Sequence, residues 1–217
     1  ERWFDGLADL APAYFGMVME TGIVSLAAHL GDLPAIARAL FALNVVVYTV
    51  LWALTVSRML RFPRRFFGDM IDHLRGPGFF TMVAGTGVLG SQFVLLEADF
   101  SVATVLWGIA IVLWVALTYT IFTGFAVKEN KPSLDRGISG AWLLAVVSTQ
   151  SIAVLSALLA AHIGQPYKLE INFFALSMWL WGGMLYIWMM SLIFYRYNFF
   201  ALSPGDLSPP YWINMGA

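Results

Sequence analysis

Residues 12–31 read PAYFGMVMETGIVSLAAHLG, and this stretch contains a single charged residue, Glu20. About 20 mostly apolar residues in a helix are enough to cross the roughly 30 Å hydrocarbon core of a bilayer. The stretch therefore predicts a membrane-spanning helix with a carboxylic acid near its middle. An ionisable group at that depth costs about 2.5 kcal/mol or more, so it indicates either a function or a specific structural contact.

The rest of the chain repeats this pattern of long apolar runs separated by short polar segments. Of its 217 residues, 60% are hydrophobic and 12% are charged, and the mean hydropathy is +0.77. Soluble domains have about 25% charged residues, roughly twice as many. We therefore predict one all-α polytopic membrane domain over residues 1–217, with spans at about 12–30, 37–57, 78–96, 103–127, 137–161 and 172–195.

The composition also excludes several classes of function. The chain has no cysteine, which excludes disulfides, thiolate metal sites and cysteine nucleophiles. Its net charge is −1 and it has no basic tail, so nothing indicates a nucleic-acid partner. The sequence contains no paired-histidine zinc motif and no lysine within a predicted span. We expect neither an enzyme nor a bound cofactor or metal.

The basic residues of the loops predict the orientation in the membrane. Two residues, Arg38 and Lys168, belong to loops on one side of the six predicted spans. The other ten belong to the opposite side: Arg2, Arg58, Arg61, Arg64, Arg65, Arg75, Lys128, Lys131, Arg136 and Arg196. Because cytoplasmic loops carry an excess of Lys and Arg, we expect a multi-pass protein of the cell (inner or plasma) membrane with a cytoplasmic N-terminus.

The arginine-rich segment RMLRFPRRFFGDMIDHLRGPGFF, residues 58–80, allows two interpretations. In the first, its arginines only keep a loop on the cytoplasmic side. In the second, Arg58, Arg61, Arg64 and Arg65 form an electropositive vestibule that concentrates anions before a pore. The two interpretations are compatible.

The spans alternate between two compositions. The second, fourth and sixth are rich in Trp, Tyr, Leu and Ile, whereas the first, third and fifth contain Gly, Ala, Ser, Thr and Gln. Because membrane helices associate through small residues and polar contacts, the odd spans should be inner helices and the even spans outer ones, as in repeated hairpins. The predicted path residues on the inner helices are Glu20, Thr21, Ser25, Thr86, Gln92, Thr149 and Ser156, and Gly22, Gly87 and Gly90 are candidate bending points.

A helical wheel of the first span gives Glu20 a defined direction. At about 100° per residue, Glu20 shares a sector with Ala13, Gly16 and Ala27, whereas Phe15 and Met19 occupy a different sector that suits lipid or an outer helix. The acid should therefore point inward, among residues small enough for a second backbone to approach. The alternative is a structural role, in which a protonated or paired Glu20 ties helices together.

PAYFGMVMETGIVSLA in the first span, together with RFPRRFFGDMIDHLRGPGFF and the final PPYWINMGA, resembles the tellurite-resistance/dicarboxylate transporter family, which includes the plant slow-type anion channels. PPYWINMGA is similar to the bacterial branch associated with four-carbon dicarboxylates. The resemblance implies ten helices, as five hairpins in quasi-fivefold order around a central pore lined by the odd-numbered helices. It also implies a homotrimer, and a gating phenylalanine on the ninth helix, beyond Ala217. The chain departs from the family's pattern in two ways: Glu20 stands where the bacterial channel relatives tend to have a small residue, and the first, third and fifth spans lack the mid-membrane prolines that often kink inner helices of the family.

Six of those ten helices fall within the chain. The sequence starts with Glu1 rather than Met, and it becomes apolar again at residues 211–217, after Pro209 and Pro210. We interpret residues 211–217 as the start of a seventh span, and the chain as a fragment of a longer protein.

The predicted function is transport of small anions, with four-carbon dicarboxylates such as malate as candidate substrates. Two mechanisms remain open. In a passive channel for ions such as chloride or nitrate, contacts along the path must be weak, so Glu20 must be neutral or off the path. In a proton-coupled carrier, Glu20 is the proton site. A haem protein ligated by His29 and His162 is the alternative from another functional class.

Overall fold

The protein is a bundle of long helices in a computed structural model that describes residues 6–201 and 209–215. All regular elements among these residues are helical, and six of the helices are long and apolar enough to cross a membrane. This confirms the prediction of an all-α polytopic membrane protein. The six candidate spans are Pro12–Leu30, Pro34–Arg61, Gly76–Glu97, Phe100–Val127, Gly140–Ala160 and Tyr167–Phe199.

Each odd span is composite, whereas each even span is one helix. Each odd span begins with a four-residue 3-10 turn. The first span is η1 (Pro12–Phe15) followed by α2 (Gly16–Leu30), and the fifth is η4 (Gly140–Leu143) followed by α8 (Leu144–Ala160). The third span is η2 (Gly76–Phe79), α5 (Phe80–Gln92) and the π-helical turn η3 (Phe93–Glu97). The even spans are α3 (Pro34–Arg61), α6 (Phe100–Val127) and α9 (Tyr167–Phe199). Shorter elements are α4 (Pro63–Met70), α7 (Leu134–Gly137) and η6 (Pro209–Met215).

Local sequence signals explain where several helices begin. Pro34 and Pro63 lie in the first turns of α3 and α4, where the missing proline N–H has no helical partner to lose. The Asp99 carboxylate caps α6 by accepting hydrogen bonds from the backbone N–H groups of Ser101 and Val102. The turns before α3 and α6 are tight because Asp32 and Ala98 adopt left-handed conformations, with φ values of 57° and 52°.

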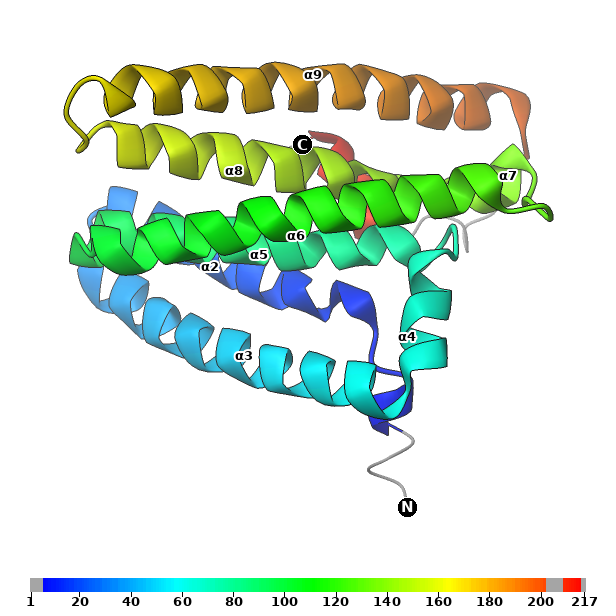
Figure 1. Ribbon diagram of the computed structural model, residues 1–217, viewed down its shortest axis with the longest axis horizontal. Helices are drawn as coiled ribbons and strands as arrows, with labels where there is room; N and C mark the ends of the chain where they lie inside the picture. The colour runs from blue at the N-terminus through cyan, green and yellow to red at the C-terminus, as the bar shows by residue number, and fades with distance from the viewer. Residues whose placement is uncertain (1–5, 202–208, 216–217) are drawn as a thin grey trace.

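The helices form two layers. In their most apolar 18-residue stretches, the third and fifth spans are 78% and 72% buried, whereas the second, fourth and sixth are only 17%, 22% and 28% buried. Figure 1 shows α5 in the middle of the bundle, with α2 and α8 beside it and α3 and α9 at the two edges. Packing of α6 against both α5 and α8 completes the outer layer. The composition of the spans thus predicted which helices are most enclosed.

The three outer helices bury the same pattern of positions. Four buried positions in α3 recur 66 residues later in α6 and a further 72 residues later in α9. They are Ala37, Asn44, Leu51 and Thr55 in α3, Ala103, Ala110, Leu117 and Ile121 in α6, and Ala175, Gly182, Met189 and Ile193 in α9. The 3-10 turns of the inner helices also recur every 64 residues, at 12, 76 and 140. The chain is therefore built from repeated inner–outer hairpins.

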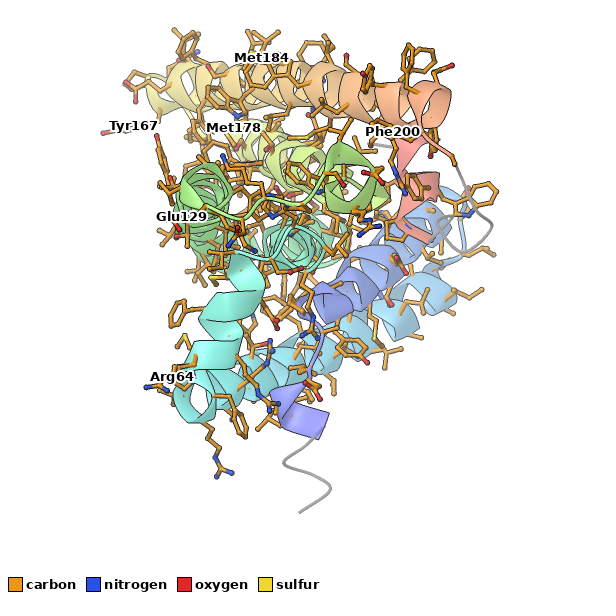
Figure 2. The ribbon with its side chains drawn as sticks, turned by 90° about the vertical axis from the view of Figure 1, so that its right-hand side faces the viewer. Arg64, Glu129, Tyr167, Met178, Met184 and Phe200 are labelled. Atoms are coloured by element: carbon orange, nitrogen blue, oxygen red, sulfur yellow. The ribbon has the colours of Figure 1, made fainter. Side chains whose placement is uncertain are left out.

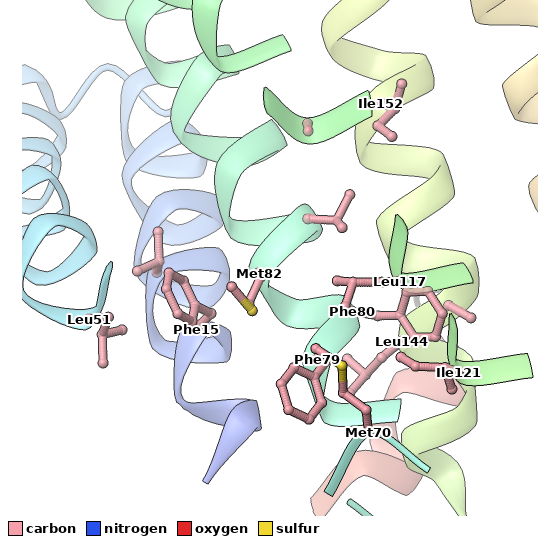
Figure 3. Packing of buried hydrophobic residues seen from close by; sticks show 14 of the residues in the cluster. Phe15, Leu51, Met70, Phe79, Phe80, Met82, Leu117, Ile121, Leu144 and Ile152 are labelled. Carbon is pink, nitrogen blue, oxygen red and sulfur yellow. The ribbon is translucent and has the colours of Figure 1, made fainter. Parts of the chain in front are cut away.

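The main apolar cluster lies where the 3-10 turns meet the inner helices. Phe15, Phe79 and Phe80 are each no more than 2% exposed, and they pack with residues of α6 and α8 such as Ile121 and Leu144 (Figure 3). Lipid tails are as apolar as these side chains, so the cluster stabilises the bundle through close packing rather than through exclusion of water. This packing fixes the directions of α2, α5 and α8 relative to one another.

Candidate functional site

Glu20 lies in α2 on a face that the other described helices leave open. Its neighbours Val18, Gly22 and Ser25 are buried where α2 packs against α3 and α5, whereas the Glu20 side chain is exposed. None of the ion pairs among the described residues involves Glu20. An ionisable side chain that faces lipid at this depth is costly. The open face of α2 is therefore the surface of the bundle that most needs water or further protein beside it.

The predicted path residues on α2 and α5 have polar partners on the outer helix α3. Thr86 Oγ1 lies 3.0 Å from the Tyr48 hydroxyl, and Asn44 Nδ2 donates to Gln92 Oε1 at 2.7 Å. Because Thr86 gives its own proton to the Met82 carbonyl, Tyr48 is the donor in the first pair. On α2, the Ser25 hydroxyl donates to the Ala37 carbonyl at 2.7 Å.

The same arrangement recurs between α6 and α8. Trp114 Nε1 donates to Thr149 Oγ1 at 2.8 Å, and Trp107 Nε1 donates to Ser156 Oγ at 2.7 Å. Both hydroxyls also donate to a carbonyl one turn back in α8, so each acts as donor and acceptor at once. Interhelical bonds of this kind contribute about 0.6 kcal/mol each in membranes.

The structure thus divides the predicted path residues into two groups. Ser25, Thr86, Gln92, Thr149 and Ser156 are fully buried and bonded toward outer helices, whereas Glu20 and the half-buried Thr21 lie on or beside the open face of α2. These hydrogen bonds show that the five buried residues hold the helices together. A role in the path remains a prediction for all seven.

The glycines proposed as bending points occupy close contacts between helices. A Cβ atom on Gly87 would lie 2.7 Å from Ser151 Oγ and 3.2 Å from the Ser151 carbonyl carbon. One on Gly22 would lie 3.0 Å from Asn44 Nδ2, and Gly90 faces Leu155 in the same way. Both α2 and α5 continue as α-helix through these positions. Their observed contribution is close approach of neighbouring helices.

Arg58 is held inside the protein at the end of α3. Its guanidinium is 2% exposed, pairs with the Asp69 carboxylate at 2.5 Å, and donates to the Ala8 carbonyl at 3.1 Å. Arg75 pairs with the other oxygen of Asp69 at 2.9 Å, and the Phe66 ring lies against Arg58. These contacts tie α3, α4 and the N-terminal segment together. They also take Arg58 out of any surface that an anion meets first.

The remaining arginines of the proposed vestibule are on the surface. Arg61, Arg64 and Arg65 are exposed, and Arg65 makes a long ion pair of 3.6 Å with Asp9. Figure 2 shows Arg64 projecting from α4, away from the bundle. These three arginines are accessible to anions in solution, and their role in an electropositive vestibule remains a prediction.

The two histidines considered as haem ligands lie at the end of the bundle opposite α4. His29 is exposed in the last turn of α2, and the His162 ring packs on Phe100 with 4.0 Å between centroids. Among the described residues, no group of three or more His, Asp or Glu side chains is placed to hold a metal ion.

Comparison with known proteins gives these features a family. The model of the voltage-dependent anion channel family (SLAC1) matches residues 9–217, almost the whole chain. The chain belongs to this anion channel family. This match confirms the resemblance seen in the sequence, because the SLAC1 family is the one that contains the plant slow-type anion channels and the dicarboxylate transporters.

Two relatives in the family are named uncharacterized transporters of Methanocaldococcus jannaschii. MJ0576 is 24% identical over 100% of this chain and 63% of its own length, and MJ0762 is 23% identical over 94% of this chain and 60% of its own length. The chain therefore spans about three fifths of the length of these relatives. No solved structure matches it significantly. Both the family and its named relatives belong to transport proteins rather than to enzymes.

The outer helices supply polar partners that their bulky composition does not indicate. Asn44, Tyr48, Trp107 and Trp114 each donate a hydrogen bond to an inner helix. A usable signal was present. Trp107 and Trp114 are seven residues apart, as are Thr149 and Ser156, and this spacing lets antiparallel helices form two matched pairs.

Proposed function

We propose that the complete protein moves small anions across the cell membrane along a path that passes the open face of α2. The observation that carries the proposal is the exposed, unpaired carboxylate of Glu20 within a membrane-spanning helix of an anion channel family member. A carboxylate in that position requires water or polar protein beside it. A path for hydrated ions supplies both.

The path in this proposal has Glu20 and Thr21 on its wall, and the exposed arginines at its cytoplasmic entrance. Arg61, Arg64 and Arg65 raise the local concentration of anions, while their distance from Glu20 keeps them from neutralising it. The buried hydroxyls of α5 and α8 support the wall by fixing the inner helices to the outer ones.

Four-carbon dicarboxylates such as malate are the substrates we propose, and the resemblance of PPYWINMGA to the dicarboxylate branch supports them. We also propose that the protein assembles as a homotrimer, and the family resemblance supports this as well. Uptake of malate, chloride and nitrate into liposomes containing the full-length protein separates the substrates. Transport of chloride and nitrate without malate would replace the dicarboxylate by a small inorganic anion.

The mechanism we propose is proton coupling through Glu20. A carboxylate that is charged repels an approaching anion, and a protonated carboxylate does not. An anion that enters together with a proton therefore meets a neutral Glu20, and release of both returns the carboxylate to its charged form. A passive channel has no step of this kind, because its path never needs Glu20 to change charge.

The variant Glu20→Gln tests this mechanism, because it keeps the shape of the side chain and fixes it neutral. In liposomes with the full-length protein, accumulation of labelled malate driven by a proton gradient should be lost, while exchange of malate across the membrane should persist. The matched control is Glu97→Gln, which changes an exposed carboxylate at the end of η3 and should behave as wild type. Wild-type pH dependence in Glu20→Gln from about pH 5 to about pH 8 would refute proton coupling and leave Glu20 a structural residue.

A further inference from the structure

A polar cavity of about 590 Å³ lies beside the end of α6, away from Glu20 and from the exposed arginines of α4. Residues 72–74, between α4 and η2, form one side of it, and residues 128–132, which follow α6, form the other side together with Arg136 of α7. Three cations, Lys128, Lys131 and Arg136, line the cavity together with His73. Figure 2 shows Glu129, another lining residue, at this end of the helices.

Hydrogen bonds to Ile71 and from Trp142 of η4 fix the two sides of the cavity. The Lys128 ammonium donates to the Ile71 carbonyl at 3.2 Å, and Trp142 Nε1 donates to the carbonyls of His73 at 3.1 Å and Gly137 at 3.0 Å. The His73 ring stacks on Phe125 with 4.3 Å between centroids. A ligand would therefore meet a preformed surface, and preformed sites bind at a lower entropic cost.

The charges of the cavity favour an anion. Among the described residues, no carboxylate lies within ion-pair distance of Lys128, Lys131 or Arg136. Of the two acids in the lining, Asp72 uses one carboxylate oxygen to accept hydrogen bonds from the backbone N–H groups of Leu74 and Arg75, at 2.9 Å each. The other is the exposed Glu129. Three cations therefore face two carboxylates, one of which is turned toward its own loop.

The His73 ring adds a charge that depends on pH to the wall of the cavity. Its Nδ1 is buried and makes no hydrogen bond to any described residue, so a ligand in the cavity does not reach this atom. An oxyanion accepts strong, charge-assisted hydrogen bonds from ammonium and guanidinium groups. We propose that this cavity binds a phosphate or carboxylate group, with Lys128, Lys131 and Arg136 as donors and a protonated His73 as a further positive charge in the wall. This binding site goes beyond the transport function proposed above, because it requires no passage of its ligand across the membrane.

Binding should be linked to protonation of His73. Burial lowers the pKa of His73 below its usual 6.5, Lys128 and Lys131 lower that pKa further, and Asp72 opposes them. Glu129 and Arg136 are the other charged groups in the lining, while Phe125 and Trp142, which contact the ring from α6 and η4, are uncharged. A bound anion favours the charged imidazolium, so it should raise the pKa of His73, and the anion should bind more tightly as the pH falls.

Histidine NMR on the full-length protein measures this linkage directly. The protein is labelled on histidine and placed in nanodiscs of the neutral lipid phosphatidylcholine, and the His73 signal is identified by its loss in His73→Gln. Millimolar inorganic phosphate or succinate, at constant ionic strength, should raise the midpoint of the His73 titration by about half a pH unit or more. In a second arm, phosphatidylglycerol replaces part of the neutral lipid, with no soluble anion added.

The two arms distinguish the sources of the bound group. A rise with soluble phosphate or succinate supports a free anion as ligand, and a rise only with phosphatidylglycerol supports a lipid headgroup. Either rise should be lost in the double variant Lys131→Gln/Arg136→Gln and kept in Arg38→Gln, which removes a cation at the opposite end of the bundle. An unchanged titration in both arms, or an equal rise in the double variant, would overturn the proposal. Neither result depends on whether Glu20 couples transport to protons.

Discussion

The charged residues at the end of the bundle that carries α4 are of two kinds, a buried ion pair and exposed arginines. Arg58 and Asp69 are buried together and join α3 to α4. Figure 1 shows α4 running across the ends of the helices. Arg64 and Arg65, only a few residues away, are exposed. A buried ion pair contributes little net stability against apolar residues of equal size, but it is sensitive to the loss of one partner. At this scale, an arginine's burial decides its role more than its place in a basic run does.

The Asp69→Asn variant should destabilise the protein strongly, because it leaves Arg58 buried with no counter-charge. Removal of one partner of a buried pair costs about 3–5 kcal/mol. The matched control, Asp9→Asn, breaks the exposed pair with Arg65 and should cost less than about 1 kcal/mol. Thermal unfolding of the purified full-length variants in detergent compares the two. Equal loss of stability in both would mean that the Arg58–Asp69 pair does not hold α4 in place.

At the scale of helices, the outer helices α3 and α6 each make two kinds of contact. Buried side chains pack on the preceding inner helix, and aromatic donors reach the next inner helix along the chain. Tyr48 in α3 and Trp114 in α6 are equivalent by the 66-residue repeat, and each donates to a threonine. A further 72 residues on, Tyr186 occupies the same position in α9, two helical turns after Trp179 and on the same side of the helix. The hairpins are thus linked in series by hydrogen bonds within the membrane.

Gly87→Ala should weaken the contact between α5 and α8. The added methyl group would come within 3.2 Å of the Ser151 backbone, which cannot move without shifting α8, and such overpacking costs about 1–3 kcal/mol. Gly108→Ala is the matched control on α6, where a Cβ atom meets nothing within 4 Å, and there the better helix propensity of alanine should leave stability unchanged or improved. Thermal unfolding again gives the comparison. Similar melting temperatures for both variants would show that α5 and α8 can separate at little cost.

The order of the helices could be predicted from the sequence, but the directions of their polar groups could not. Runs of apolar residues gave the spans, and the contrast between small-polar and bulky runs gave the inner and outer layers. A wheel places Thr149 on a polar face of α8, yet it cannot say that Trp114, 35 residues earlier, is the neighbour it meets. Arg58 was likewise grouped with Arg61, Arg64 and Arg65 because its partner Asp69 belongs to a separate helix. Such contacts depend on how helices distant in sequence are packed.

For the molecule as a whole, charge is distributed unevenly between the two ends of the bundle. The loop from α3 to η2, the loop from α6 to η4 and the end of α9 lie at one end, and the short turns before α3, α6 and α9 lie at the other (Figure 1). The first end carries the buried Arg58–Asp69 pair, the exposed arginines of α4 and the basic cavity around His73. Both anion-attracting surfaces proposed for the protein therefore face the same compartment.

That compartment should be the cytoplasm, because nine of the eleven Lys and Arg residues in the described part of the chain lie on this side and such an excess sets the orientation during insertion. The sites for a test are Ser133, exposed at the start of α7, and Gln165, exposed in the loop between α8 and α9. The chain has no cysteine of its own to compete for reagent. In intact cells, a membrane-impermeant maleimide should label Gln165→Cys and not Ser133→Cys, whereas permeabilised cells should label both. Labelling of Ser133→Cys alone in intact cells would reverse the orientation. In that orientation both basic surfaces would lie outside the cell, and they would attract external anions rather than cytoplasmic ones.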